Sequence, residues 1–487
     1  MTKIKMSKKE IVISAFMFIF AYVFLMLSMF LMFFINNGNQ VFALFQERVN
    51  NVITVTVSSA ILTLVVYFYF FIENKNVLAR PSKIIEMFLL MYIAFIICGT
   101  IAKYIAPTAR PLLFYSLMTA MILRRREAIF VNSVFALILF IFNRLLNSAD
   151  IVSGEIQLIE SFSSLLTVFA GGVVAIFMLK NIKTRLACVL IGVVLFIPTV
   201  LINVVMQLTI ISGDVGFEVI EVFLYSAFDC MFSVLLFMAI LPIVEAVFGE
   251  FTPFRLRELT SDGAKLISKM KQNALGTYNH CIVVAQLAEA CASAIGEDSE
   301  LARAAAYYHD VGKLKNPEMF TENQSEFDLH KELTPELSVD IIRSHTREGA
   351  KLIKKNRLPE FFADIAVEHH GTMPIKYFYA KALKMSDGEL NVANYSYPGP
   401  TPTTKIAAII MIADASEAAC RSLRDRSPEN VAALVGNIVE ERMNMEQFSN
   451  CEITMRELTL ITRTVINQLA GVYHSRVKYP KLQLSRK

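Results

Sequence analysis

The stretch IVISAFMFIFAYVFLMLSMFLMFFI occupies residues 11–35 and contains no charged residue. A helix needs ~20 mostly apolar residues to cross the hydrocarbon core of a bilayer, so this stretch can cross it once. Its length, and the absence of a small-residue cleavage pattern after it, indicate a retained membrane anchor rather than a signal peptide.

Apolar runs continue beyond the anchor, at 52–72, 86–105, 109–123, 128–146, 157–179, 186–211 and 218–248. Together with the anchor they predict eight crossings, of which 109–123 is the shortest. The hydrophobic fraction of 55% exceeds the ~45–50% that is typical of soluble domains. Charged residues return after residue 249, which predicts a membrane region followed by one soluble domain.

Positive charge is distributed unequally between the two sides of the predicted membrane region. Four lysines precede the anchor, and the second, fourth and sixth loops between crossings each carry three Lys or Arg residues. The opposite loops carry three such residues altogether. Because cytoplasmic loops are enriched in Lys and Arg, both termini and the soluble domain are predicted to be cytoplasmic.

Three acidic residues, Glu160, Glu221 and Asp229, lie in or near the apolar runs, and Asp229 lies deepest. Ionisable residues inside a membrane can mark a transport pathway, although burial against other helices explains single residues equally well. Neither a charge relay nor an internal repeat accompanies them, so a transporter with a regulatory domain is the weaker hypothesis. The net charge of +4 is too small to indicate a nucleic-acid polymer as partner.

The soluble half shows a helical pattern almost throughout, with apolar residues at three-to-four spacing and nearly no strand-like alternation. Basic and apolar residues alternate before it, in FTPFRLRELTSDGAKLISKMK (251–271), which resembles a juxtamembrane helix. Such a helix can rest on anionic headgroups of the lipid bilayer or pair with a second copy in a homodimer, although a plain solvated linker helix explains the pattern equally well. The predicted fold is all-α, and its parts are an anchor with a short outer loop (1–51), a seven-helix membrane region (52–248), a linker (249–275), the soluble domain (276–475) and a basic tail (476–487).

Six of the seven histidines fall between residues 280 and 370. Asp310 and Asp414 sit among apolar neighbours, where a lone carboxylate is costly to bury unless it is paired or bound to a metal. A single histidine or HD dipeptide is weak evidence, but the ordered pattern H…HD…H…HH…D is specific. We interpret it as a metal cluster, formed by His280, His309, Asp310, His345, His369, His370 and Asp414. His330 lies in a polar loop and is left out.

Seven ligands exceed the four that one zinc ion takes, so the pattern suits two metals that share a ligand. A carboxylate beside a histidine can place one oxygen on each of two ions ~3.5–4 Å apart, the spacing used for phosphoryl transfer. A mixed imidazole and carboxylate shell favours iron or manganese over magnesium.

Several longer runs resemble the bacterial seven-transmembrane HD family, which includes the PgpH-type cyclic-di-AMP phosphodiesterases: GTYNH (276–280), YYHDVGKLKNPEMFTENQ (307–324), EHHGT (368–372), YFYAKA (377–382), YPGP (397–400) and ADASEAACRSL (413–423). The resemblance implies a hydrolase of the cell membrane with a cytoplasmic HD domain, which converts cyclic-di-AMP to 5′-pApA. It implies one metal on His280, His309, Asp310 and Asp414, and another on Asp310, His345, His369 and His370. Three features depart from the family: residues 36–51 replace a large extracytoplasmic sensor domain, Ser396 stands where an arginine precedes YPGP, and the loop before His345 is divergent.

The hypothesis for the mechanism is that a hydroxide bridging the metals attacks phosphorus in line with the 3′-oxygen leaving group. Asp310 is its catalytic residue together with Lys313, which is three residues away and could bind a phosphate oxygen, although a solvated lysine explains the spacing equally well. Arg421 is a weaker phosphate-binding candidate, two helical turns past Asp414. Tyr377 and Tyr397 are candidates to stack on the bases, although tyrosines are also ordinary core residues.

Two further readings stay open. An HD enzyme could act on another nucleotide, cyclic-di-GMP or a linear dinucleotide, although the GYP motif expected of cyclic-di-GMP enzymes is not evident after the HH pair. A nucleotide-sensing membrane receptor could carry an inactive HD domain, but an inactive site would not need a complete set of ligands.

Overall fold

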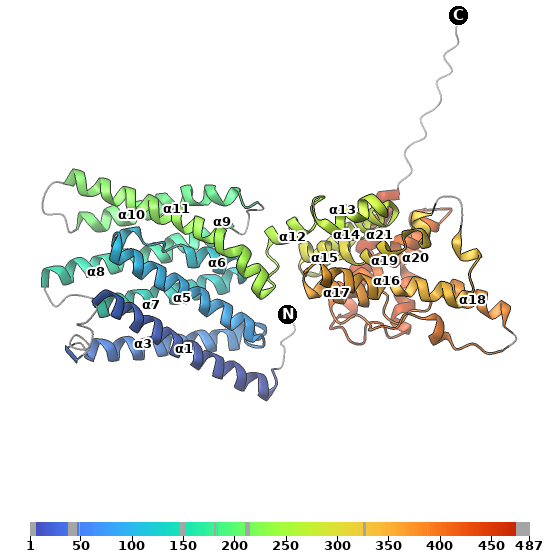
Figure 1. Cartoon of the computed structure of the whole chain (residues 1–487), viewed down its shortest axis with the longest axis horizontal. Coiled ribbons are helices and arrows are strands. Elements are labelled where there is room, and N and C mark those ends of the chain that lie inside the picture. The colour runs from blue at the N-terminus through green and yellow to red at the C-terminus, as the bar shows by residue number, and fades with distance from the viewer. Residues whose placement is uncertain are drawn as a thin grey trace, which may run out of the picture. The chain divides into compact units, whose positions relative to one another are not determined.

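The computed structural model describes residues 6–37, 46–47, 49–146, 151–179, 182, 184–209, 215–324, 328–386 and 388–473. The chain divides into two units, Met1–Phe254 and Arg255–Lys487. Every regular element of the described residues is a helix, and one isolated bridge joins Pro374 and Ser396, so the all-α prediction is confirmed (Figure 1). The five-part division of the chain stays a prediction, and the predicted tail, 476–487, lies outside the described residues.

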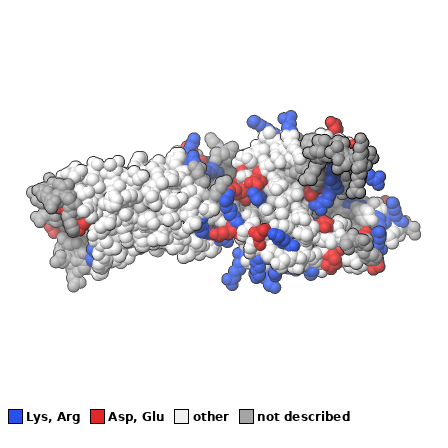
Figure 2. Space-filling view, turned by 90° about the horizontal axis from the view of Figure 1, so that it is seen from above, with Lys and Arg blue, Asp and Glu red and all other residues white. Residues whose placement is uncertain are grey.

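The first unit is a bundle in which seven helices of the described chain are long and apolar enough to cross a membrane. The side of this unit that Figure 2 shows carries few charged side chains. The first helix is packed into the bundle, since Tyr22 donates a hydrogen bond to Thr56 O at 3.1 Å. The elements of this unit are α1 (Lys8–Asn37), α3 (Val49–Glu73), α4 (Lys75–Leu78), α5 (Pro81–Tyr104), the 3₁₀ turn η2 (Pro107–Ala109), α6 (Phe114–Ile122), α7 (Arg125–Leu146), α8 (Ile151–Leu166), the π turn η3 (Thr167–Gly171), α9 (Gly172–Leu179), α10 (Ala187–Leu208) and α11 (Val215–Phe248).

The prediction of a continuous helical crossing over 109–123 was wrong. The helix there, α6, has nine residues and spans about 13 Å, less than half of a hydrocarbon core of ~30 Å. The chain nevertheless returns along α5, because Cys98 contacts Pro111 O near one end and Lys83 donates to Ile122 O near the other. Pro107 and Pro111 lack backbone donors and precede α6, which begins only at Phe114. We call residues 105–123 the broken crossing.

Side chains from other helices satisfy the polar groups of the broken crossing. Arg110 is buried and donates hydrogen bonds to Ser164 Oγ at 2.7 Å and to Asn143 Oδ1 at 3.3 Å. The amide of Leu112 donates to Asp229 Oδ1 at 3.0 Å. Non-helical backbone is tolerated at membrane depth only where protein or a water-filled cavity surrounds it. Asp229 therefore has a structural role that requires no transport pathway.

Loops that the charge pattern predicts to be on one side meet at one end of the first unit. Lys83 Nζ lies 2.6 Å from Glu250 Oε2, and Arg185 Nη2 lies 2.8 Å from Glu245 Oε2. The ring of Phe254 is buried and lies under the guanidinium of Arg185. The end of α11 and the first residues after it are therefore held to the basic end of the bundle.

The second unit packs its helices around small side chains. Ala304, Ala305 and Ala306 are fully buried and allow α14 and α15 to approach each other closely. The elements after α11 are α12 (Pro253–Leu259), α13 (Lys265–Asn273), α14 (Leu275–Ile295), α15 (Ser299–Tyr308), α16 (Pro335–Lys355), α17 (Glu360–Glu368), α18 (Lys376–Met385), α19 (Lys405–Ser422), α20 (Pro428–Asn444) and α21 (Met455–Tyr473), with 3₁₀ turns η4 (Val311–Lys315), η5 (Pro317–Met319), η6 (Thr321–Asn323), η7 (Leu329–Lys331) and η8 (Val392–Tyr395).

The linker forms two helices, α12 and α13, instead of the single amphipathic helix that was predicted. The apolar side chains of α13 are buried within the chain, and they are Leu266, Ile267 and Met270. A face that is buried in this way cannot lie on a membrane, so the prediction was wrong in this respect. The linker is also tied to the soluble domain by Tyr308, whose hydroxyl donates to Leu259 O at 2.6 Å.

Candidate metal centre

The seven residues predicted as metal ligands come together from separate helices. They are His280 on α14, His309 and Asp310 at the end of α15, His345 on α16, His369 and His370 at the end of α17, and Asp414 on α19. They form two groups, in each of which the candidate ligand atoms lie within 4.8 Å of one another. Asp310 belongs to both groups.

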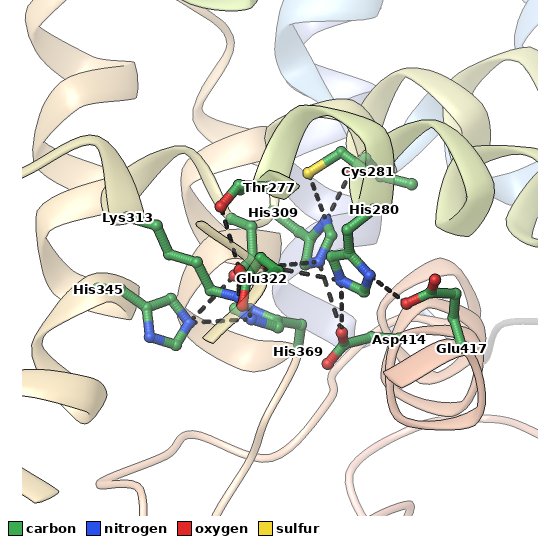
Figure 3. Close-up of polar contacts among 12 residues, drawn as sticks. Thr277, His280, Cys281, His309, Lys313, Glu322, His345, His369, Asp414 and Glu417 are labelled. Atoms are coloured by element: carbon green, nitrogen blue, oxygen red, sulfur yellow. Dashed lines mark hydrogen bonds and ion pairs between the residues drawn. The ribbon is translucent and has the colours of Figure 1, made fainter. Parts of the chain in front are cut away.

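Asp310 lies between the two groups. Its Oδ1 is 3.3 Å from His345 Nε2 and 3.7 Å from His369 Nε2. Its Oδ2 is 3.4 Å from His309 Nε2 and 3.6 Å from His280 Nε2. Figure 3 shows His345 and His369 on one side of the centre, with His280 and His309 on the other. One carboxylate thus faces two pairs of histidines with different oxygens, as a ligand shared by two cations would.

Backbone carbonyls determine which ring nitrogen these histidines present to the centre. His309 Nδ1 lies 2.6 Å from Ala306 O, one helical turn back. His345 and His369 use the carbonyl at the same spacing, at 2.6 Å and 3.0 Å. When one ring nitrogen of a neutral imidazole donates to a carbonyl, the other nitrogen keeps a lone pair that can bind a metal. All three Nε2 atoms face Asp310 at the centre.

The atoms at the centre are buried, and several lack a hydrogen bond within the described chain. These atoms are both oxygens of Asp310, which has only ion pairs, and Nε2 of His309. A buried polar atom left without a partner costs about 1–3 kcal/mol, so their grouping calls for a ligand. Divalent transition metals accept a shell of imidazole and carboxylate, and the residues present therefore fit a metal site.

The two aspartates are held in their charged form. Burial would raise the pKa of Asp310, but Lys313 and His309 hold that pKa well below its usual range. Burial is likewise outweighed at Asp414, where His280 and His309 hold the pKa well below its usual range. Burial lowers the pKa of His345 to about 4, which keeps that ring neutral. Charged carboxylates and neutral imidazoles are the states in which these side chains bind metals.

Lys313 connects the centre to a neighbouring turn. Its Nζ lies 2.7 Å from Asp310 Oδ2 and 2.8 Å from Glu322 Oε1. Thr277 donates a hydrogen bond to the same oxygen of Glu322 at 3.1 Å, which links the turn to the start of α14. The sequence analysis missed Glu322, because an acidic residue in a polar turn carries no periodic signal.

Glu417 supports His280 from outside the centre. Its Oε2 lies 2.5 Å from His280 Nδ1, while Nε2 of the same ring lies 2.9 Å from Asp414 Oδ1. Although burial disfavours protonation, Asp414 and Glu417 raise the pKa of His280 to about 9, so a metal must displace a proton there. Arg421 holds Glu417 at 2.5 Å. The sequence analysis missed Glu417, although its spacing of three from Asp414 places both on one helix face.

We expect Glu417→Ala to weaken metal binding about 10–100-fold, because a ligating histidine loses the carboxylate that orients it. Calorimetric titration of Mn²⁺ into the full chain measures this affinity without any turnover. Glu417→Gln should lose less, since its amide oxygen can still accept the Nδ1–H. Equal affinities for wild type, both variants and the exposed control Glu440→Gln would contradict a positioning role for Glu417.

A cavity of about 910 Å³ opens onto the centre. Its wall includes all four residues predicted to bind substrate, Lys313, Tyr377, Tyr397 and Arg421. The ring of Tyr397 stacks on His370, with centroids 4.2 Å apart, so it covers a candidate ligand. Tyr377 is 68% exposed and free to meet a flat group at the rim.

Comparison with known proteins accounts for both units. The family described as 7TM receptor with intracellular HD hydrolase matches residues 49–252, and the HD domain family matches residues 277–419. The chain belongs to the seven-transmembrane HD family. This seven-transmembrane HD protein is a multi-pass membrane protein, and between residues 49 and 252 it has six of the long apolar helices and the broken crossing.

Two curated relatives bear the name cyclic-di-AMP phosphodiesterase PgpH. The protein of Bacillus subtilis (strain 168) is 39% identical over 290 residues, which are 59% of this chain and 41% of the relative. The protein of Listeria monocytogenes serotype 1/2a (strain 10403S) is 37% identical over 314 residues, 64% of this chain and 44% of the relative. The chain thus spans less than half the length of these relatives. The crystal structure of the L. monocytogenes PgpH HD domain in complex with cyclic-di-AMP is 45% identical, covers 44% of this chain and 99% of that chain, and has a TM-score of 0.42.

Proposed function

We propose that this seven-transmembrane HD protein is a membrane-bound, metal-dependent phosphodiesterase that hydrolyses cyclic-di-AMP to 5′-pApA. The observation that carries the proposal is Asp310, whose two oxygens face separate pairs of histidines beside a cavity of about 910 Å³. The names of the two PgpH relatives support the choice of substrate. We also propose that the two ligand groups hold two divalent transition metals, iron or manganese, since imidazole and carboxylate shells favour these ions.

The metals, when bound, would supply an activated water and neutralise charge on the phosphate. Hydrolysis would join the oxygen of a water to phosphorus, break the bond from phosphorus to the 3′-oxygen and leave a proton on the 3′-hydroxyl. In this proposal Lys313 binds a non-bridging oxygen of the attacked phosphate, and Tyr377 stacks on a base. Arg421 has a first role in holding Glu417 and stays a weaker phosphate-binding candidate.

We propose that the HD domain and both termini are cytoplasmic, because cytoplasmic loops are enriched in Lys and Arg. The ion pairs of Lys83 and Arg185 support this, since they gather basic loops and the end of α11 at one end of the bundle. A homodimer that pairs two copies of the chain stays a prediction, which light scattering of the detergent-solubilised chain can test.

The full chain in lipid nanodiscs, loaded with Mn²⁺ or Fe²⁺, provides the test of the proposed function. Turnover of cyclic-di-AMP and cyclic-di-GMP is followed by chromatography, beside the Asp310→Ala variant. Release of 5′-pApA that is lost in the variant supports the proposal. Faster turnover of cyclic-di-GMP than of cyclic-di-AMP would overturn the proposed substrate. Metal binding without turnover of either nucleotide would favour the inactive receptor.

Arg442 is a further residue of the cavity wall that the sequence analysis missed. Its Nη1 donates to Ile438 O at 3.1 Å, whereas its buried Nε has no hydrogen-bond partner in the described chain. A charged donor left unused beside a cavity can bind a phosphate oxygen, and such a bond contributes about 1.5–3 kcal/mol.

We therefore expect Arg442→Gln to raise KM for cyclic-di-AMP about 10–100-fold while kcat changes little, because the lost bond forms with bound substrate. Steady-state kinetics in nanodiscs measures both constants. The exposed Arg456→Gln serves as the control of equal charge change. A fall in kcat at constant KM would instead assign Arg442 to the chemical step.

A further inference from the structure

A second cleft lies where the linker meets the end of α16. Its volume is about 390 Å³, and its walls come from residues 258–259, 264–266 and 355–358 together with Tyr308. We call it the linker cleft. It shares no residue with the cavity at the metal centre. The proposed hydrolase therefore leaves this cleft without a role.

The linker cleft has an excess of positive charge. Lys265, Lys355 and Arg357 line it, all three are exposed, and Glu258 is its one acidic residue. None of the three cations forms an ion pair or a side-chain hydrogen bond within the described part of the chain. Neighbouring lysines of α16 behave differently, since Lys351 pairs with Glu348 and Lys354 pairs with Glu360, both within 3.0 Å. The unpaired cations thus gather at the cleft and not along the whole helix.

The first turn of α13 adds polar donors to the same cleft. Ala264 precedes this helix of nine residues and gives its amides no side-chain cap. Ala264, Lys265 and Leu266 all belong to the wall. Cationic side chains together with free amides suit a phosphate group, which accepts several hydrogen bonds and carries negative charge.

The linker cleft follows soon after the last membrane helix in the sequence, since α11 ends at Phe248 and the first wall residue is Glu258. Phe254 is buried in the apolar core of the first unit and belongs to α12, as does Leu259 of the cleft wall. Five residues separate them, which is about 7.5 Å along a helix. Because so few residues connect the cleft wall to a membrane helix, the phosphate that we assign to this cleft is the headgroup phosphate of a phospholipid.

We propose that the linker cleft binds the phosphate of an anionic phospholipid headgroup through Lys265, Lys355 and Arg357. The contact bears on the metal centre, because Leu259 O accepts the hydrogen bond of Tyr308, and Tyr308 directly precedes the candidate ligand His309. A headgroup bound in the cleft thereby changes the rate of hydrolysis at the metal centre, a consequence that rests on the proposed function. The binding itself does not rest on that function.

Amide hydrogen exchange of the full chain tests the binding in nanodiscs made of phosphatidylcholine alone or with phosphatidylglycerol. We expect exchange at residues 355–358 and 264–267 to slow about tenfold with phosphatidylglycerol, because a bound headgroup suppresses local opening. The double variant Lys355→Gln/Arg357→Gln should lose this protection. The matched variant Lys351→Gln/Lys354→Gln, which removes the same charge from the last turns of α16, should keep it.

Equal exchange in the two lipids, or protection that survives in Lys355→Gln/Arg357→Gln, would overturn the proposal. Protection by inorganic phosphate in phosphatidylcholine nanodiscs, without any effect of phosphatidylglycerol, would assign the cleft to a soluble phosphate compound instead of a lipid. Turnover of cyclic-di-AMP in the two lipids is measured separately. A chain that shows lipid-dependent protection but no turnover would contradict the proposed hydrolase and leave the headgroup site standing.

Discussion

Replacing Asp310 with alanine is expected to abolish hydrolysis, with a loss of at least about a thousandfold in kcat/KM. The reason is that Oδ1 and Oδ2 face different pairs of histidines, at 3.3–3.7 Å and 3.4–3.6 Å. The variant removes a ligand from both groups at once, so the affinity for both metals should fall together. Metal analysis of the purified full chain, beside the turnover of cyclic-di-AMP, measures the two losses.

A variant of the exposed Asp364 to alanine is the control, because it removes a carboxylate from α17 without touching the centre. Asp310→Asn refines the result, since the amide keeps one oxygen and the shape of the side chain. If Asp310→Ala lost one metal and kept the other at full affinity, the idea of a shared ligand would be wrong. The neighbouring group would then have to bind its metal with histidines alone.

Gly312→Ala should strongly destabilise the soluble domain. A Cβ at this position would lie 1.9 Å from His345 O and 2.5 Å from Gly349 N. Both are backbone atoms of α16, so the methyl group can be accommodated only if that helix moves away. Overpacking of this kind costs about 3 kcal/mol or more. His345 moves with the helix, so metal affinity should fall as well.

Thermal unfolding with a thiol-reactive dye measures this effect, because all seven cysteines are free and buried. The melting temperature of the soluble domain should fall by about 6–12 °C, as expected for 3 kcal/mol in a domain of this size. Gly436→Ala is the matched control, since nothing lies within 4 Å of its Cβ and alanine favours a helix. An unchanged melting temperature for Gly312→Ala would mean that α16 does not pack against the turn after Asp310.

The sequence predicted the parts of the structure that depend on local pattern. Long apolar runs predicted the long helices of the bundle, because a membrane demands uninterrupted apolar length. The order of histidines and aspartates singled out seven residues that the structure brings together. This was possible because metal ligands come from a few residue types, whose order along the chain can be recognised.

Features that depend on contacts between distant segments were missed. The run 109–123 is apolar enough for a helix, but the contacts of Arg110 and Leu112 with later helices support a non-helical backbone there. The linker has an amphipathic pattern, but this pattern does not show whether its apolar face contacts lipid or the rest of the chain. In the structure the apolar face of α13 is buried within the chain. Glu417 lies on the same helix face as Asp414, but its role depends on the contact with His280 of α14, which local spacing does not predict. The role of Arg442 likewise depends on where α20 meets the cavity.

The broken crossing also has a consequence for the biogenesis of the protein. The partners of Arg110 and Leu112 on α8 and α11 lie 54 and 117 residues later in the chain. At a synthesis rate of about 5–20 residues per second, Asp229 is made about 6–23 seconds after Leu112. The segment cannot settle into lipid as an independent helix during that delay, because its arginine and unpaired amide have no partners there. The hydrogen bond to Leu112 therefore becomes available only when α11 is made, the same helix that leads into the soluble domain.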